Sequence, residues 1–234
     1  MALTAQSVRE QVAWACRILA LEGYADLTLG HVSAKPADGE AIYIKRKGVA
    51  LDEVEPSDIV DLNDPTAVLH LETVLHTEIY ALRPDVGAVV HGHPPYATAF
   101  GATNARFELL THDAVLFADG VSVFDETAEL ITEREQGRAV AEALGPRRAV
   151  ILANHGVVIA DKDVRWAVLS AITLERAIRL QAIAATLGEL RPIPKLLAER
   201  MVADKYQEGF LDEYWAAWIR RTRRAGADEG MPPA

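Results

Sequence analysis

The stretch VGAVVHGHPPYATAF, residues 86–100, constrains the fold more than any other part of this 234-residue chain. A short apolar run leads directly into His91-Gly92-His93, and two prolines follow. The run is typical of a buried strand, and side chains two residues apart on a strand point to the same face. Because proline cannot continue a ladder of hydrogen bonds, the strand must end here, so both imidazoles are expected at the rim of a sheet.

A second apolar run, AVILAN at residues 149–154, ends in His155-Gly156 in a similar way. If the two runs are neighbours in one sheet, His91, His93 and His155 form a single facial set of imidazoles. Imidazole nitrogens bind zinc at about 2.0–2.1 Å, and three protein ligands with an open position are typical of a catalytic metal site. The pattern therefore predicts a divalent metal, zinc in the first place, with manganese or cobalt as alternatives. The competing interpretation is three unrelated polar residues at strand ends.

Composition and charge exclude several classes of protein. Half of the residues are apolar, which is enough for one well-buried core. We therefore expect a single domain over residues 1–234, with a C-terminal extension from about residue 190. The formal charge of −10 argues against binding to nucleic acid or to anionic membranes. The single cysteine, Cys16, leaves no internal disulfide and fits a cytoplasmic location, and no signal peptide or membrane-helix pattern is present.

Hydrophobic periodicity predicts an α/β chain. Helices are expected over about residues 7–22, 70–83, 132–145 and 163–187, and strands over 27–35, 41–48, 86–90 and 149–154. Strands and helices do not alternate with the strict rhythm of a parallel sheet. The pattern therefore favours a central mixed sheet that is covered by helices on both faces.

Glu72 lies four residues before His76 on the helix expected over residues 70–83, so the two side chains would share a face. A carboxylate near a metal can act as a fourth ligand or move protons during a reaction. The alternative interpretation is a solvated glutamate with an ordinary helical partner.

Two further clusters suggest substrate groups. The run Lys45-Arg46-Lys47 stands out against the acidic composition, and predicts either an anion-binding patch or a solvated strand end. His112-Asp113 is either an imidazole oriented by a carboxylate, which would suit catalysis, or a loop turn.

The sequence HLETVLHTEIYALRPDVGAVVHGHPPYA, followed by AVILANHGVVIADKDVRWAV, resembles the class II aldolase/adducin family over roughly residues 7–190. This resemblance implies a three-layer α/β/α sandwich around a mixed, largely antiparallel sheet. It implies a divalent metal held by His91, His93 and His155, with Glu72 as the catalytic acid/base. It also implies a homotetramer with active sites between subunits, where a residue from the C-terminal region, Tyr206 or Tyr214, reaches a neighbouring site.

The chain departs from the phosphate-using members of that family at three places. Their Gly-Asn-x-Ser pattern reads Gly30-His31-Val32-Ser33 here, the hydroxyl residues before the glutamate read His70-Leu71, and their Thr-Gly turn reads Lys47-Gly48. These changes favour a carboxylate-bearing substrate without a phosphate. The expected substrate-binding residues are His31, Ser33, Lys45, Arg46, Lys47 and His70.

The sequence therefore predicts a metal-dependent carbon–carbon lyase, an aldolase or a decarboxylase, that acts on a small oxygenated substrate through a metal-stabilised enolate. Glu72 would move the proton, and His112 and Tyr206 are the further catalytic candidates. A sugar-phosphate epimerase or dehydratase using the same ion, and a non-catalytic adducin-like scaffold, remain the alternatives.

Overall fold

The computed structural model describes residues 5–36, 39 and 41–232, and a seven-stranded sheet lies at its centre. The strand order is β3-β2-β1-β4-β7-β6-β5, and every neighbouring pair is antiparallel except β5 and β6. The strands are β1 (His31–Ala34), β2 (Tyr43–Lys45), β3 (Ile59–Asp61), β4 (Ala88–Gly92), β5 (Ser122–Phe124), β6 (Ala149–Leu152) and β7 (Gly156–Asp161). The predicted mixed, largely antiparallel sheet is confirmed.

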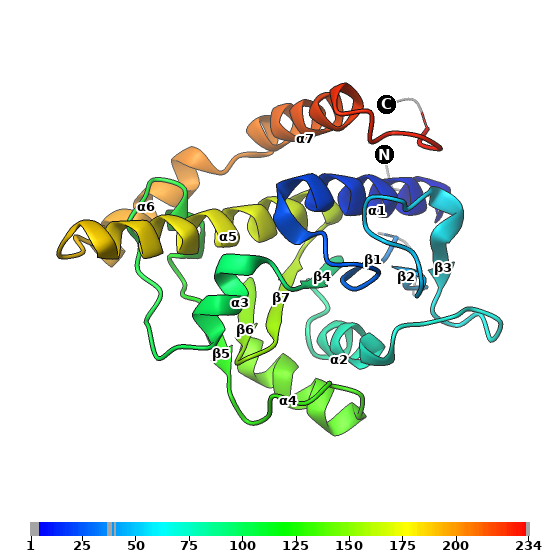
Figure 1. The fold of residues 1–234 in the computed structure, drawn as a ribbon, viewed down its shortest axis with the longest axis horizontal. Coiled ribbons are helices and arrows are strands. Elements are labelled where there is room, and N and C mark those ends of the chain that lie inside the picture. Colours follow the sequence, from blue (N-terminus) through cyan, green and yellow to red (C-terminus); the bar gives the residue numbers. More distant parts are fainter. Residues whose placement is uncertain (1–4, 37–38, 40, 233–234) are drawn as a thin grey trace.

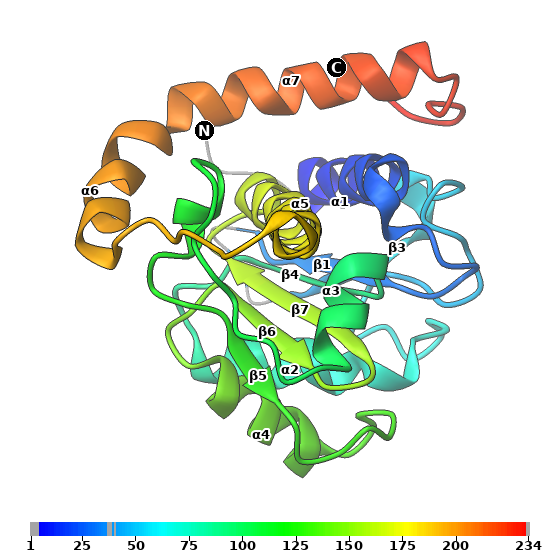
Figure 2. The ribbon, with the colours of Figure 1, turned by 60° about the vertical axis from the view of Figure 1, so that its left-hand side comes forward.

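Helices cover both faces of the sheet and make the expected α/β/α sandwich. Figures 1 and 2 show α1 and α5 on one face and α2 and α4 on the other, with α7 lying outside α1 and α5. The helices are α1 (Ala5–Leu19), α2 (Val74–Leu82), α3 (Pro95–Gly101), α4 (Arg134–Leu144), α5 (Val164–Leu187), α6 (Lys195–Lys205) and α7 (Glu208–Arg224). A π-helical turn, Ala20–Tyr24, continues α1.

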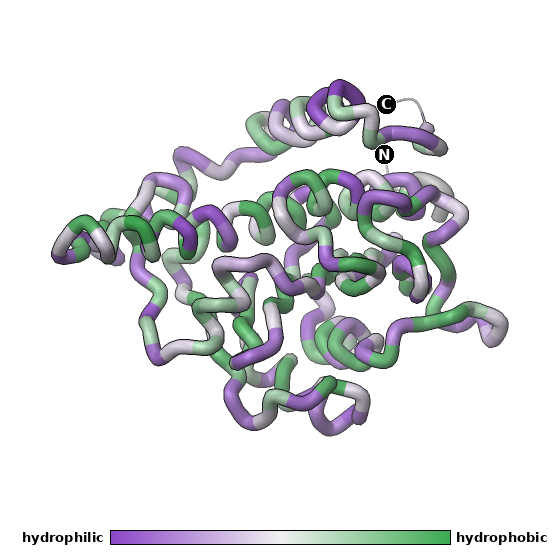
Figure 3. Tube along the Cα trace, in the orientation of Figure 1, coloured by the Kyte–Doolittle hydropathy of each residue, from purple (hydrophilic) through white to green (hydrophobic). Residues whose placement is uncertain are grey.

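The two-residue period of the strands decides which helix layer each side chain meets. On β7, Val157 and Ile159 pack in one core cluster with residues of α1 and α5, whereas Val158 packs with α2 and α4. Burying such a side chain fully contributes roughly 1.5–3 kcal/mol. In Figure 3 the strands beneath α5 include hydrophobic segments, and α7 alternates between hydrophilic and hydrophobic residues. The same period on β4 sends Val90 toward α1 and α5 and therefore His91 toward α2.

The helix expected over residues 70–83 is shorter than predicted, because Glu72 breaks it. Its φ of −91° and ψ of 23° are not helical, and residues Leu71–Thr73 form a 3-10 turn before α2 begins at Val74. The expected helical face shared by Glu72 and His76 is therefore wrong. The kink turns the Glu72 carboxylate toward the end of β4 instead.

The C-terminal helices pack back onto the body of the molecule. On α7, Leu211 and Ile219 are buried in the core cluster that contains residues of α1 and α5. Whether residues from about 190 onward form a separable extension stays a prediction. None of the helices in the described part of the chain combines the length and the apolar character that crossing a bilayer requires.

Candidate metal centre

The three predicted ligand histidines meet where β4 ends and β7 begins. His91 lies on β4, His93 follows that strand directly, and His155 lies in the tight turn between β6 and β7. β4 and β7 pair in antiparallel register, with Gly92 opposite Val157, so the end of one strand faces the start of the other.

Glycine at position 156 makes this close approach possible. A Cβ atom built there would lie 2.6 Å from the Gly92 carbonyl oxygen and 2.6 Å from His93 Cδ2, closer than side chains tolerate. The NHG sequence therefore lets the turn press against the end of β4, and this contact brings His155 to the other two rings.

The geometry of the cluster is compatible with a metal ion. One nitrogen from each of His91, His93 and His155 lies within 4.8 Å of the others. The ring centroids are 5.0 Å apart for His91 and His93, 5.1 Å for His91 and His155, and 5.3 Å for His93 and His155. The structure thus brings the three residues together as expected, and their role as ligands stays a prediction.

Hydrogen bonds on the far side of two of these rings set their tautomers. His91 Nδ1 lies 3.0 Å from the Val157 carbonyl oxygen, and His93 Nδ1 lies 2.9 Å from Asp26 Oδ2. Both partners can only accept, since an ionised carboxylate has no proton to give, so each Nδ1 donates, and in a neutral ring the Nε2 then carries the lone pair. Such second contacts orient metal-binding histidines in many proteins.

The two Nε2 atoms are buried and have no hydrogen-bond partner among the described residues. Leaving a buried polar atom unpaired costs about 1–3 kcal/mol. Burial and the neighbouring His91 lower the pKa of His93, which favours the neutral ring with its free lone pair. A divalent cation bound by His91, His93 and His155 would satisfy these nitrogens, so the residues present fit a metal such as zinc.

Glu72 completes the cluster from the α2 side. Its Oε2 lies 3.5 Å from His91 Nε2 and its Oε1 lies 3.5 Å from His155 Nε2. Oε1 also accepts a hydrogen bond of 3.0 Å from the Ile131 N–H. Burial works to raise the pKa of Glu72, but hydrogen bonds to its charged form, including this one from the Ile131 N–H, outweigh it and hold the pKa well below its usual range. The carboxyl is therefore ionised and stands beside the three imidazoles.

A cavity of about 140 Å³ opens over the cluster. Predicted substrate residues His31, Lys47 and His70 line it together with Glu72, His91 and His93, and the leucines Leu29, Leu71 and Leu130 form its apolar part. These three leucines are 45%, 61% and 54% exposed, so the cavity has an apolar rim that faces solvent.

The expected anion-binding patch over residues 45–47 is not formed as a unit. Lys45 is fully buried, and its Nζ donates to the backbone carbonyls of Thr28 and Val49 at 3.1 and 2.6 Å. Arg46 lies on the other side of the strand and pairs with Asp58 at 2.8 Å. Neighbouring residues of an extended chain point in opposite directions, which separates Arg46 from Lys45. Only Lys47 lines the cavity.

Ser33 is also placed differently from the expectation. It is fully buried, does not line the cavity, and its Oγ lies 2.6 Å from His76 Nδ1. Binding of substrate by Ser33, Lys45 and Arg46 stays a prediction that would require contacts other than those of this cavity.

His112 and Tyr206 lie together at a different place, beside α5 and α6. Lys205 Nζ is 3.0 Å from His112 Nδ1, and Tyr206 Oη donates to the Asp113 carbonyl at 2.6 Å. Burial raises the pKa of Tyr206. Neither residue lines the cavity over the histidines. A catalytic role for them stays a prediction, and it would have to be exerted at the site of a neighbouring subunit.

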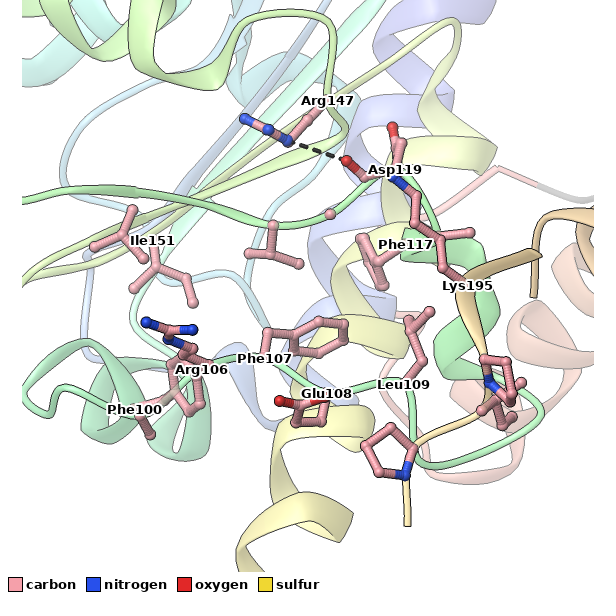
Figure 4. A pocket seen from close by; sticks show the side chains of 18 residues that line it. Phe100, Arg106, Phe107, Glu108, Leu109, Phe117, Asp119, Arg147, Ile151 and Lys195 are labelled. Atoms are coloured by element: carbon pink, nitrogen blue, oxygen red, sulfur yellow. Dashed lines mark hydrogen bonds between the residues drawn. The ribbon is translucent and has the colours of Figure 1, made fainter. Parts of the chain in front are cut away.

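A cavity of about 700 Å³, larger than the one over the histidines, lies at the β5 edge of the sheet, away from the histidine cluster (Figure 4). Phe107 and Phe117 meet edge to face there, with centroids 5.8 Å apart, and Arg147 donates to the Asp119 carbonyl. No histidine lines this cavity. The candidate site is therefore assigned by its chemical groups and not by its volume.

The fold and the histidine cluster together define an α/β/α sandwich with a candidate metal centre at one end of its sheet. A sequence model described as the class II aldolase and adducin N-terminal domain matches residues 10–182. The chain therefore belongs to this family.

Named relatives include two lyases. The 3,4-dihydroxyphthalate decarboxylase of Arthrobacter keyseri is 33% identical over 212 residues, which cover 82% of this chain and 85% of that protein. The L-fuculose phosphate aldolase of Methanococcus maripaludis is 31% identical over 176 residues, which cover 72% of this chain and 92% of that protein. These relatives support a lyase-type enzyme.

Among solved structures, the L-fuculose 1-phosphate aldolase from Glaciozyma antarctica PI12 superimposes with a TM-score of 0.83 at 22% identity, covering 97% of this chain and 92% of that one. At this level of identity the similarity shows a shared fold. The fold predicted from the sequence agrees with it.

Proposed function

We propose that this chain is a metal-dependent carbon–carbon lyase, and that it removes carbon dioxide from a small hydroxylated carboxylic acid. The observation that carries the proposal is the pair of buried Nε2 atoms of His91 and His93, which have no hydrogen-bond partner among the described residues, with the Glu72 carboxylate 3.5 Å from the Nε2 of His91. A divalent cation, zinc first among the candidates, would supply a Lewis acid for the substrate oxygen on which negative charge develops.

The residues of the site suit a single proton shuttle. Glu72 begins ionised, so it can take the proton of a substrate hydroxyl. Glu72 then returns this proton to the substrate carbon that carries the carboxylate, which turns the hydroxyl oxygen into a carbonyl. When the carbon–carbon bond to the carboxylate breaks, carbon dioxide leaves and the electron pair moves onto that oxygen, which water protonates to restore the hydroxyl. Lys47 and His70 line the cavity where the substrate would be held.

The apolar rim favours an aromatic acid over a sugar phosphate. Leu29, Leu71 and Leu130 offer no hydrogen-bond donors to a phosphate, but their side chains can pack against the face of a ring. The similarity to a decarboxylase whose name specifies a dihydroxylated aromatic acid supports the same direction.

Aldol cleavage is the second candidate, and the similarity to an aldolase favours it. The same carboxylate would take the proton of a β-hydroxyl group, an aldehyde would leave instead of carbon dioxide, and Glu72 would again return the proton to carbon. The two reactions use the same carboxylate and differ in the leaving group and in whether the proton reaches carbon before or after the carbon–carbon bond breaks.

The proposed enzyme is a cytoplasmic homo-oligomer, a tetramer in the first place. The solvent-facing leucine rim supports this arrangement, because a second subunit could cover the rim and bring its own Tyr206 near the site. Light scattering of the purified protein measures the assembly, and a monomer that retains full activity would contradict it.

The test combines metal content with turnover. The purified protein is expected to bind about one equivalent of zinc, manganese or cobalt per chain and to release carbon dioxide or an aldehyde from one member of a panel of hydroxy-aromatic acids, oxo acids and sugar phosphates. His93→Ala should lose the metal and the activity while staying folded. A wild-type protein that binds no divalent metal, and is indifferent to added metal, would favour the non-catalytic scaffold.

Glu72→Gln should keep the metal and lower kcat by roughly 100-fold or more, in the range of a lost general acid or base. Glu78→Gln is the matched control, since Glu78 is a glutamate of similar burial, at 6% against 8% exposure, that pairs with Arg134 outside the cavity. Unchanged turnover in Glu72→Gln would rule out the proposed proton shuttle.

A further inference from the structure

A chain of hydrogen bonds runs behind the candidate metal centre from α2 through β1. Tyr80 Oη lies 2.9 Å from Ser33 Oγ, Ser33 Oγ lies 2.6 Å from His76 Nδ1, and His76 Nε2 lies 2.6 Å from His31 Nδ1. All four residues are buried, with at most 7% exposure. The chain ends at His31, whose ring lines the cavity over the histidine cluster.

The strand register explains why these residues meet. His31 stands directly opposite His91 on the neighbouring strand β4, and Val32 packs toward α1 and α5. His31 and Ser33 therefore both point toward α2, where His76 lies within reach of each of them. The order of the strands in the sheet determines this arrangement, and no pattern along the sequence predicts it.

Each hydrogen bond of the chain needs one donor, and the Tyr80 end decides in which direction the donors point. Burial raises the pKa of Tyr80, so its hydroxyl keeps a proton to donate. Ser33 Oγ, at 2.9 Å, is the partner that the hydrogen bonds of the described residues give this hydroxyl. Among the described residues, Ser33 is therefore the partner left to accept the phenolic proton.

The remaining links follow from the first one. Ser33 accepts a hydrogen bond from Tyr80 and donates one to His76 Nδ1. An imidazole whose Nδ1 accepts a hydrogen bond has its lone pair there and therefore carries its proton on Nε2. His76 must then donate from Nε2 to His31 Nδ1, which leaves the proton of His31 on Nε2.

The tautomer separates two possible roles of His31. The side chains of His31, Glu72 and His91 could form a second metal-binding group beside the one made by His91, His93 and His155. A nitrogen that carries a proton cannot bind a metal, because its lone pair is part of the aromatic ring. His91 and His93 have the opposite arrangement, with lone pairs on Nε2 that face the centre.

We infer that the hydrogen-bond chain Tyr80–Ser33–His76–His31 holds the proton of His31 on Nε2, so that His31 donates a hydrogen bond to a substrate oxygen and is not a metal ligand. His76 is then a positioning residue that acts through His31. The part that concerns substrate rests on the proposed function, whereas the tautomer and the ligand set do not.

Nitrogen-15 NMR of the histidine rings tests this inference in the full-length protein. Long-range proton–nitrogen correlations distinguish a ring nitrogen that carries a proton from one with a free lone pair. The spectrum is expected to show His31 and His76 both protonated on Nε2, with signals assigned by their loss in His31→Gln and His76→Asn. Loading with cadmium-113 should give cadmium–nitrogen couplings at three rings and none at His31.

Two substitutions of His76 form a matched pair. A glutamine amide reaches the place of Nε2 and can still donate to His31, whereas an asparagine amide reaches the place of Nδ1 and contacts only Ser33. His76→Gln should therefore keep His31 protonated on Nε2, and His76→Asn should give a mixture of tautomers. With a substrate in hand, His76→Asn should lower kcat roughly two- to tenfold, as expected for one uncharged hydrogen bond, and His76→Gln should recover most of it.

A protonated Nδ1 on His31, or a cadmium coupling at this ring, would overturn the inference. The same outcome would leave the proposed lyase intact as long as the three other rings bind cadmium. Absence of any bound metal would instead contradict the proposed function, while the tautomer of His31 could still be read. If neither His76 variant folds, the wild-type spectrum decides the question alone.

Discussion

The contact between Asp26 and His93 gives the most direct measure of how the protein prepares its candidate metal centre. Asp26 Oδ2 lies 2.9 Å from His93 Nδ1, and the aspartate side chain is 38% exposed. Loss of such an outer partner typically lowers metal affinity by about 10- to 100-fold. Because water can replace an exposed carboxylate as acceptor, we expect Asp26→Ala to fall at the lower end, about tenfold or 1.4 kcal/mol.

The identity of the replacement separates orientation from charge. An asparagine oxygen can still accept from His93 Nδ1, so Asp26→Asn should keep the tautomer and lose only the negative charge. Its zinc affinity is expected to lie between those of the wild type and Asp26→Ala. Asp212→Asn is the control, because the Asp212 carboxylate is 64% exposed on α7 and pairs with Arg165.

Competition with a chromophoric zinc chelator measures the affinities. Thermal unfolding at saturating zinc provides a second readout, since tenfold weaker binding removes about 1.4 kcal/mol of ligand-derived stability. His93→Ala should bind zinc far more weakly than any of the aspartate variants. If Asp26→Ala binds zinc as tightly as Asp212→Asn, then Asp26 does not prepare His93, and the tautomer assigned to His93 from this contact loses its support.

Two further predictions concern stability. Gly156→Ala places a Cβ 2.6 Å from the Gly92 carbonyl oxygen and should lower the free energy of unfolding by about 1–3 kcal/mol, the usual cost of overpacking. Gly209→Ala is the control, because a Cβ at position 209 would have no neighbouring atom within 4 Å. This variant should leave the free energy of unfolding unchanged or raise it by up to about 1 kcal/mol. Denaturant titration compares the pair, and equal stabilities would contradict the described contact. Lys45→Met should lower the free energy of unfolding by about 1–3 kcal/mol in the same assay, because it leaves buried carbonyls unpaired. Unchanged stability would contradict a structural role for the buried Lys45 ammonium group.

The parts of the site that depend on local pattern could be predicted from the sequence. Alternation along β4 and the prolines after it placed His91 and His93 at the end of a buried strand. The glycine after His155 indicated a tight turn, and pairing of β4 with β7 then brought the third ring into place. These are properties of a few consecutive residues, which is why the sequence carries them.

Other parts depend on which strands become neighbours, and no short pattern encodes that. Asp26 lies 67 residues before His93 in a loop without any distinguishing motif. Helical spacing predicted that His76 shares a helix face with Glu72, whereas the sheet order places His76 against β1, where it contacts His31. Lys45 looked like part of a charged patch, because nothing in the run of residues 45–47 shows that the fold buries its Nζ against the carbonyls of Thr28 and Val49.

Distance alone does not sort the histidines of this site into roles. The ring of His91 has its centroid 5.0 Å from that of His31 and 5.0 Å from that of His93, so both neighbours are equally placed to share a ligand with it. What differs is the partner of each Nδ1. The Asp26 carboxylate faces Nδ1 of His93, so the lone pair of that ring lies on Nε2. The imidazole of His76 faces Nδ1 of His31, and Tyr80, three hydrogen bonds away, decides that His76 donates the proton of this contact. The same side chain can therefore bind a cation or donate to an oxygen, and the groups behind the ring decide which.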